Sequence, residues 1–273
     1  MLFRSSTGRF PSITEAPSLF LSVVVPAYNE EERMRKGLDE MVEYLAAKTA
    51  ENEKYTWEII IVNDGSKDGT KDIALNEYVS VYGAERVRLL QAHVNGGKGA
   101  AVRKGVMRAR GKWVLMADAD GATRFGDIAA LHAAAREAAG RGIFAFALGS
   151  RAHMHKAAGG PKRSPLRRFL MWGFHSAIQL MLGGTPIEDT QCGFKLFTRA
   201  AARTLFTDLH IERWAFDVEL VYIAAQKRIP MAEVPVVWQE IAGSKLDPAT
   251  ATIQMLRDII VIRLAYMTGL WKL

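Results

Sequence analysis

The first half of the chain alternates between short apolar runs and longer segments with helical spacing. Five apolar runs read as buried strands, at residues 19–25, 57–62, 87–91, 113–117 and 143–148. Helical spacing predicts helices at residues 30–48, 70–82, 96–110 and 125–139. Because strands and helices alternate, we expect an α/β fold with a mostly parallel central sheet and helices on both faces.

Beyond residue 150 the pattern changes. Residues 151–164 read as a basic, glycine-containing loop, residues 166–182 as an apolar or amphipathic helix, and residues 183–198 as a polar cluster. Helices are expected at 200–205, 217–227 and 251–273, with a strand at 234–238. We therefore divide the chain into a loose N-terminal arm, two halves and a C-terminal helix, at residues 1–18, 19–160, 161–250 and 251–273.

The most specific local pattern is Asp118-Ala119-Asp120, which directly follows the fourth apolar run. Two carboxylates at this spacing can share one hard divalent cation, while a nucleotide diphosphate supplies further oxygen ligands. The alternative is a pair of solvated turn aspartates that bond their own backbone.

Polar side chains also follow other apolar runs. Asp64 comes after the second run, where a carboxylate can accept hydrogen bonds from a nucleobase or a ribose; a helix cap is the alternative. Lys98 lies in a glycine-rich stretch that opens a helix, where amide groups can meet phosphate. This stretch lacks the Walker A spacing, and an ordinary turn is its alternative. Ligands bind at the carboxyl ends of parallel strands, so we expect these groups to share one edge of the sheet.

Three cationic residues and one acidic residue of the later chain are further candidates. Arg151, Lys195 and Lys245 lie in separate predicted loops and can bind an anionic donor or acceptor, with ordinary surface charge as the alternative. Asp189 can act as a base or orient a cationic side chain, and a simple turn residue is the alternative reading.

The amino-acid composition excludes few classes of binding partner. The net charge of +7 and the pI of about 9.5 favour anionic partners: nucleic acid, phosphorylated ligands or an acidic membrane face. No aromatic-basic platform or reading motif supports nucleic acid. The single cysteine, Cys192, excludes an internal disulfide and fits a reducing compartment. No run of about 18 apolar residues indicates a membrane span.

Two apolar segments have a different membrane signature. Residues 164–182 and 251–273 combine aromatic residues with flanking Arg and Lys, which is typical of a helix lying in a membrane interface. Packing as core helices on the sheet is the alternative. The basic loop before Leu166 favours the interface for the first segment, whereas the second segment fits both readings.

Taken together, these motifs resemble glycosyltransferase family 2, and within it the branch that transfers glucose to dolichyl phosphate. The matching segments are residues 21–31, 63–68, 97–99, 115–123, 149–153, 189–198, 212–220 and 240–246. The first of these fit the whole family, and the later ones are specific to the branch. The resemblance runs from about residue 20 to the end, and Asn63 departs from it because the family commonly has Asp there.

The resemblance implies a GT-A fold, which is Rossmann-like, with UDP-glucose as donor and Mg²⁺ or Mn²⁺ as cofactor. Residues 19–160 would bind the nucleotide sugar and residues 161–250 the acceptor. The residues expected to hold uridine are Pro26, Ala27, Tyr28, Glu30 and Asp64. Asp118 would touch the ribose or base, and Asp118 and Asp120 would hold the metal.

The remaining roles implied by the resemblance concern phosphate groups. Lys98, Ser244 and Lys245 would approach the donor phosphates. Arg151 and Lys195 would receive the phosphate of a dolichyl or polyprenyl lipid. Asp189 would be the catalytic base or an orienting group.

The implied product is a β-linked glucosyl phosphate lipid that feeds N-glycan precursor assembly at the cytosolic face of the endoplasmic reticulum membrane. The N-terminal anchor expected for the eukaryotic branch is absent here, so attachment would be peripheral or the chain truncated. One alternative is mannose transfer from GDP-mannose by the same fold. Another is a non-catalytic nucleotide-sugar-binding membrane adaptor, against which the intact Asp118 and Asp120 pair counts. The sequence does not indicate an oligomeric state.

Overall fold

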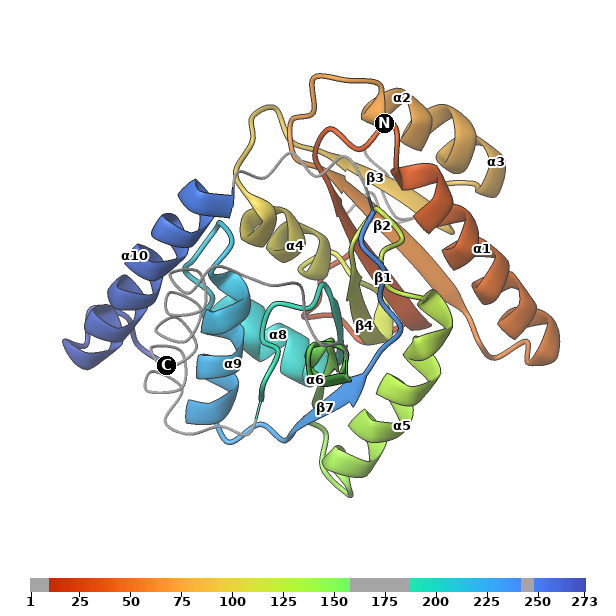
Figure 1. Cartoon of the computed structure of the whole chain (residues 1–273). Coiled ribbons are helices and arrows are strands. Elements are labelled where there is room, and N and C mark those ends of the chain that lie inside the picture. The colour runs from red at the N-terminus through yellow and green to blue at the C-terminus, as the bar shows by residue number, and fades with distance from the viewer. Residues whose placement is uncertain (1–9, 158–186, 242–247) are drawn as a thin grey trace.

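The computed structural model describes residues 10–157, 187–241 and 248–273 of the chain (Figure 1). Two predicted features lie outside the described residues. They are the interface helix at 166–182, with the second half of the basic loop before it, and the loop that carries Ser244 and Lys245. The division of the chain into two functional halves stays a prediction.

Within the described residues, seven strands form one sheet in the order β3-β2-β1-β4-β6-β5-β7. Their bounds are β1 (Leu19–Ala27), β2 (Trp57–Asn63), β3 (Val87–Gln91), β4 (Gly111–Ala117), β5 (Phe146–Ser150), β6 (Phe194–Thr198) and β7 (Met231–Pro235). β6 runs antiparallel to β4 and β5, and the other described pairs are parallel. The predicted α/β class with a mostly parallel sheet is confirmed.

Helices cover both faces of this sheet (Figure 1). One face carries α1 (Met34–Glu51), α2 (Thr70–Ile73), η1 (Ala74–Val79), η2 (Phe125–Asp127) and α5 (Ile128–Ala139). The other carries α4 (Lys98–Val106), α8 (Arg199–Thr207), α9 (Phe216–Gln226) and α10 (Pro248–Met267). Two short helices complete the set, α3 (Ser80–Tyr82) and α6 (Ala152–Ala157).

The central strand β1 shows why two cores form. Successive side chains of a strand point to opposite faces of the sheet. Val23 and Val25 therefore join the core that contains Leu38 of α1, while Val24 joins the core that contains Val102 of α4. Because both faces are buried here, three consecutive positions of the strand, 23 to 25, are apolar.

Two expectations about the later chain are wrong. Residues 183–198 were expected to be a polar cluster without a strand, yet β6 crosses the middle of the sheet. Lys195 interrupts the apolar pattern of this strand, but its side chain is buried against an acidic partner and does not break the strand. Residues 152–157 form the helix α6 where a loop was expected.

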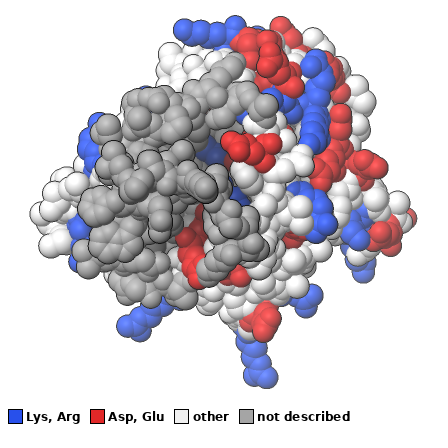
Figure 2. Space-filling view, in the orientation of Figure 1, with Lys and Arg blue, Asp and Glu red and all other residues white. Residues whose placement is uncertain are grey.

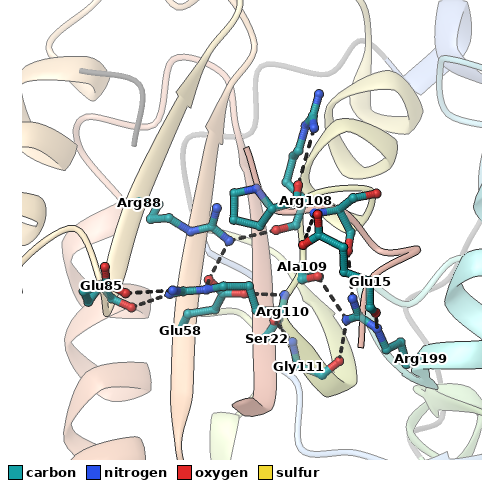
Figure 3. Close-up of polar contacts among 12 residues, drawn as sticks. Glu15, Ser22, Glu58, Glu85, Arg88, Arg108, Ala109, Arg110, Gly111 and Arg199 are labelled. Carbon is teal, nitrogen blue, oxygen red and sulfur yellow. Dashed lines mark hydrogen bonds and ion pairs between the residues drawn. The ribbon is translucent and has the colours of Figure 1, made fainter. Parts of the chain in front are cut away.

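A polar network ties the amino ends of the strands together (Figure 3). The buried Glu58 of β2 accepts hydrogen bonds from Ser22 Oγ of β1 at 2.6 Å and from Arg88 Nη2 of β3 at 2.5 Å. It also accepts from Arg110 Nε, just before β4, at 2.9 Å. A buried carboxylate requires such partners, so this end of the sheet is occupied by structural contacts.

The N-terminal arm is not loose where it is described. Ile13 is buried in the core, and its amide donates to the carbonyl of Met107 at 3.0 Å. Arg199 donates to the carbonyls of Ser12 and Glu15, at 2.9 and 3.0 Å (Figure 3 includes Arg199 and Glu15). Residues 10–18 therefore pack on the body of the protein.

The C-terminal helix packs on the core along one side, and its contact with a membrane interface stays a prediction. Ile259 and Ile262 of α10 are buried, as a core helix requires, while Ile260, Leu264 and Met267 are exposed. None of the described helices is sufficiently long and apolar to cross a bilayer. On the described part of the face in Figure 2, basic and acidic side chains are interspersed, so the excess positive charge forms no single patch there.

Candidate functional site

A cavity of about 350 Å³ opens at the carboxyl ends of β1, β2 and β4. It brings together predicted residues from four separate segments of the chain. They are Pro26, Ala27, Tyr28, Glu30, Asp64, Lys98, Asp118 and Asp120. The lining residues that prediction from the sequence missed include Arg33, Arg213 and Trp214.

Asp118 and Lys98 form an ion pair in the cavity. Lys98 Nζ lies 2.6 Å from Asp118 Oδ1 and 5.9 Å from the centre of the Trp214 ring. Burial lowers the pKa of Lys98, but the charges of Asp118 and Asp217 outweigh burial and raise it overall. The ammonium group is therefore a fixed positive charge beside the carboxylates, suited to an anionic ligand.

Gly193 packs so closely against the carboxylate of Asp118 that no side chain fits at position 193. A Cβ built on Gly193 would lie 1.9 Å from Asp118 Oδ2, closer than any real contact. Gly193 directly precedes β6, whose Phe194 pairs with Ala117 of β4. The pairing of β6 with β4 therefore places Gly193, the residue just before β6, in contact with the Asp-x-Asp motif.

Asp120 is less exposed than Asp118, and its ion pair is longer. Burial and the neighbouring charge of Asp118 raise the pKa of Asp120, although it accepts a hydrogen bond from the amide of Ala122 at 3.0 Å. Its nearest described cation is Arg33, with Nη1 3.9 Å from Asp120 Oδ2. A carboxylate in this state favours an additional cation.

Glu30 is the third acidic group of the cavity. Burial raises the pKa of Glu30 to about 7, against the opposing charge of Arg33, whose Nη2 lies 2.6 Å from Glu30 Oε1. Glu30 Oε2 is buried and has no hydrogen-bond partner within the described part of the chain. An orphan acceptor of this kind is satisfied when a ligand supplies a donor.

The Asp-x-Asp motif fits a divalent cation only with help from a ligand. Asp118 and Asp120 are hard oxygen donors on one wall of the cavity, the donor type that Mg²⁺ and Mn²⁺ prefer. In the described ranges, no three His, Cys, Asp or Glu side chains converge as a complete metal site. The chemistry matches the predicted cation whose remaining ligands come from a diphosphate.

Asp64 has a more structural contact than predicted. Its Oδ1 accepts from the amide of Gly96 at 3.0 Å, and its Oδ2 accepts from the amide of Gly97 at 2.7 Å. The carboxylate therefore holds the glycine-rich loop that leads to Lys98. Because Asp64 also lines the cavity, its contact with uridine stays a prediction.

Lys195 was expected in a loop, but it lies in β6 and is fully buried. Its Nζ contacts Asp217 Oδ1 at 2.7 Å and donates to the carbonyl of Cys192 at 2.5 Å. Burial raises the pKa of the Asp217 carboxyl, against the opposing charges of Lys195 and Lys98. Direct contact of Lys195 with a lipid phosphate would require this pair to open.

Arg151 and Asp189 form a second, separate ion pair. Arg151 Nε and Nη2 donate to the two oxygens of Asp189, at 2.8 and 3.0 Å. The Arg151 guanidinium also lies over the Trp238 ring, 5.5 Å from its centre. Burial alone would raise the pKa of Asp189, but the hydrogen bonds and charge of Arg151 outweigh it and lower the pKa.

Asp189 is therefore a weak candidate for a base and a good candidate for an orienting group. Its backbone amide donates to Glu233 Oε1 at 2.8 Å, which fixes the turn that carries it.

Cys192 is buried, and burial raises the pKa of its thiol to about 11, so no reactive thiolate is expected. The predicted phosphate ligands Ser244 and Lys245 lie outside the described residues.

Comparison with known proteins identifies the family. Residues 22–206 match the family model described as glycosyl transferase family 2. The chain belongs to this family. Within it, the chain is 50% identical to the dolichyl-phosphate beta-glucosyltransferase of Drosophila melanogaster, covering 98% of this chain and 81% of that protein. It is 48% identical to the Homo sapiens protein of the same name, covering 96% and 81%.

Solved structures of other glycosyltransferases share the fold of this family member. A crystal structure of glucosyl-3-phosphoglycerate synthase from Mycobacterium tuberculosis has a TM-score of 0.62 at 19% identity, covering 90% of this chain and 80% of that one. A structure of the same synthase with Mn²⁺ and UDP-glucose has a TM-score of 0.60 at 18% identity, covering 90% and 79%. The predicted GT-A fold and the predicted resemblance are both confirmed.

For two of the missed residues Arg33, Arg213 and Trp214, the signal lay within a matching motif. Arg213 and Trp214 belong to residues 212–220, and Arg33 follows residues 21–31 by two positions. Their neighbours in the sequence gave no reason to place them in the cavity, because the loop before α9 crosses to the glycine-rich loop only in the folded glycosyltransferase.

Proposed function

We propose that this protein is an inverting glucosyltransferase that moves glucose from UDP-glucose to dolichyl phosphate. The observation that carries the proposal is the cavity in which Asp118, Asp120 and Lys98 meet the predicted nucleotide-binding residues. The names of relatives up to 50% identical over nearly the whole chain support the acceptor and the sugar. The Mycobacterium tuberculosis synthase, crystallised with UDP-glucose, supports the donor.

The donor would enter with uridine toward the ends of β1 and β2. Tyr28 is exposed at this edge and offers an aromatic face, while the unpaired Glu30 Oε2 offers an acceptor for a nucleotide N–H or O–H group. Lys98 supplies positive charge for the diphosphate. These groups bind and orient the donor before any bond changes.

The proposed cofactor is a divalent cation, Mg²⁺ or Mn²⁺, held by Asp118 and Asp120 together with the diphosphate. When bound, such a cation neutralises the charge that develops on the departing nucleotide. The raised pKa of Asp120 and the Mn²⁺ in the structure of the Mycobacterium tuberculosis synthase support this assignment. The protein's own contribution is to fix both carboxylates, with Gly193 behind Asp118.

The acceptor needs little deprotonation. A phosphate monoester has a second pKa near 6 and is mostly dianionic at neutral pH. Arg151, clamped by Asp189 and Trp238, would orient that phosphate. One phosphate oxygen would form a bond to the anomeric carbon as the bond from that carbon to UDP breaks, which inverts the centre and gives a β-linked product. Asp189 then acts by orienting Arg151.

The acceptor lipid places the reaction at a membrane surface. The exposed apolar side chains of α10, among them Ile260, Leu264 and Met267, support contact with a bilayer, and the exposed Arg257 and Arg263 suit anionic headgroups. We assign the protein to the cytosolic face of the endoplasmic reticulum membrane, in N-glycan precursor assembly.

One assay tests the proposal. Radiolabelled UDP-glucose is incubated with dolichyl phosphate, with and without a chelator, and label is counted in the organic phase. We expect label in the lipid that the chelator abolishes and an added divalent cation restores. Lipid label from GDP-mannose instead would overturn the assignment of the sugar, and metal-dependent UDP binding without any transfer would indicate a non-catalytic adaptor.

A further inference from the structure

Arg213 and Trp214 line the donor cavity, and together with the preceding residues 210–212 they form what we name the wall segment. The carbonyl of Glu212 accepts a hydrogen bond from the amide of Ala100 at 2.9 Å. A Cβ on Gly97 would lie 2.6 Å from the Glu212 carbonyl oxygen, and one on Gly99 would lie 2.7 Å from that of Ile211. The loop that carries Lys98 therefore lies directly against this backbone, and its position follows that of the wall segment.

Glu219 of α9 holds the wall segment from behind. Its carboxylate is fully buried and accepts from the backbone amide of His210 at 3.0 Å and from that of Ile211 at 2.6 Å. His210 Nδ1 also lies 3.1 Å from Glu219 Oε1. A buried carboxylate depends strongly on such donors, so Glu219 fixes the start of the wall segment.

The C-terminal helix shares this carboxylate. Tyr266 of α10 donates its hydroxyl to Glu219 Oε1 at 3.0 Å. Just past the helix, the ring of Trp271 stacks on His210, with centroids 4.3 Å apart and planes within 5°. α10 therefore contacts the wall segment and Glu219 together, at the point where the segment begins.

The same helix also reaches the acceptor side of the molecule. Gln191 Nε2 donates to Met255 Sδ of α10 at 3.4 Å, and the amide of Gln191 donates to Asp189 Oδ1 at 3.1 Å. α10 lies at the outer edge of the molecule, far from β3 (Figure 1). Its outer side chains are open, with Ile260 59% and Met267 65% exposed.

We propose that Glu219 is a positioning residue that ties α10 to the wall segment, so that the donor cavity depends on how α10 is held. Glu219 does not line the cavity and acts only through the backbone of residues 210–212 and the loop they support. The contact that Glu219 makes between α10 and the wall segment, which we call the link, is independent of the proposed function. The expected change in UDP affinity rests on the proposed function. A helix whose outer face meets a bilayer is thereby connected to donor binding.

The test removes one hydroxyl from the link. Tyr266→Phe keeps the ring of Tyr266 and deletes its hydroxyl contacts, with Glu219 Oε1 at 3.0 Å and with His210 Nδ1 at 3.4 Å. Tyr78→Phe is the matched control, because Tyr78 donates to the carboxylate of Asp39 at 2.7 Å and lies outside the cavity lining. Hydrogen exchange of the amides of residues 97–101 is measured in the ligand-free variants, and UDP affinity is measured by calorimetry with Mn²⁺ present.

In Tyr266→Phe we expect about fivefold faster exchange at residues 97–101 and about fivefold weaker UDP binding, the factor that one lost hydrogen bond supports. Tyr78→Phe should show neither change at a similar loss of melting temperature. Equal exchange at residues 97–101 in the two variants would overturn the link. Wild-type protein that binds UDP but transfers no glucose would overturn the proposed function and leave the link standing.

Discussion

Gly193→Ala tests the contact between β6 and the Asp-x-Asp motif. Gly193 is not among the glycines with positive φ, so alanine adds no backbone strain there. Its Cβ would instead meet Asp118 Oδ2 at 1.9 Å. Restoring ordinary van der Waals contact requires Asp118 to move by about 1.5 Å. That movement breaks the 2.6 Å contact between Asp118 and Lys98.

The size of the effect follows from the contact that is lost. A charge-assisted hydrogen bond contributes about 1.5–3 kcal/mol. The Asp118 side chain is 37% exposed, so solvent screening favours the low end of this range. We therefore expect Gly193→Ala to lower kcat/KM for UDP-glucose by about tenfold.

The assay is glucosyl transfer to dolichyl phosphate at varied UDP-glucose, with melting temperature as the check on folding. Gly126→Ala is the matched control, because a Cβ there would meet only Tyr44 Cε2 at an ordinary 3.8 Å. If folded Gly193→Ala and Gly126→Ala have the same kcat/KM, the close approach of Gly193 does not position Asp118 and the reasoning fails.

Four further predictions address the charged groups. Asp120→Asn should abolish turnover because it removes charge from the proposed cation site; full activity in a metal-titrated assay would remove that role. Asp189→Asn should retain some turnover but raise the KM for dolichyl phosphate several-fold, because it disturbs an orienting contact and not a base. A large loss of kcat at an unchanged KM would instead assign Asp189 the role of base. The pKa of Glu30 is raised to about 7, so the folded state holds its proton more tightly than the unfolded chain does, and this stabilisation is lost as pH rises from about 4.5 to about 7. Urea unfolding should show that, between pH 5 and pH 8, the free energy of unfolding falls by on the order of 2 kcal/mol more in wild type than in Glu30→Gln. An equal fall in the two proteins would contradict this. Lys195→Met should destabilise the fold by about 3–5 kcal/mol by leaving a buried carboxylate unpaired, and adding Asp217→Leu should recover part of it; a double variant as unstable as the single one would count against the pair.

Much of the fold and of the donor site was predictable because those signals are local. An apolar run followed by a polar cluster marks the carboxyl end of a parallel strand, and parallel strands bring such ends to one edge. That logic places Asp64, Asp118 and Asp120 in one cavity before any coordinates are known, and the cavity confirms it.

The remaining features of the fold and site depend on contacts between residues far apart in the sequence, which no local pattern predicts. Lys195 reads as a surface charge until Asp217, from a distant helix, is known to lie 2.7 Å away. Arg213 and Trp214 enter the cavity because Glu219 and the glycine-rich loop hold their segment from both sides. A charge is an unreliable sign of a loop when its partner comes from another part of the chain.

The placement of β6 has a consequence for biosynthesis. β6 separates β4 from β5, although β4 and β5 are both made before it. A nascent chain that stops before residue 194 would thus leave one edge of β4 and both edges of β5 unpaired, the kind of surface on which chains aggregate. Closing the sheet, and with it seating Gly193 against Asp118, must wait until this late strand has been synthesised.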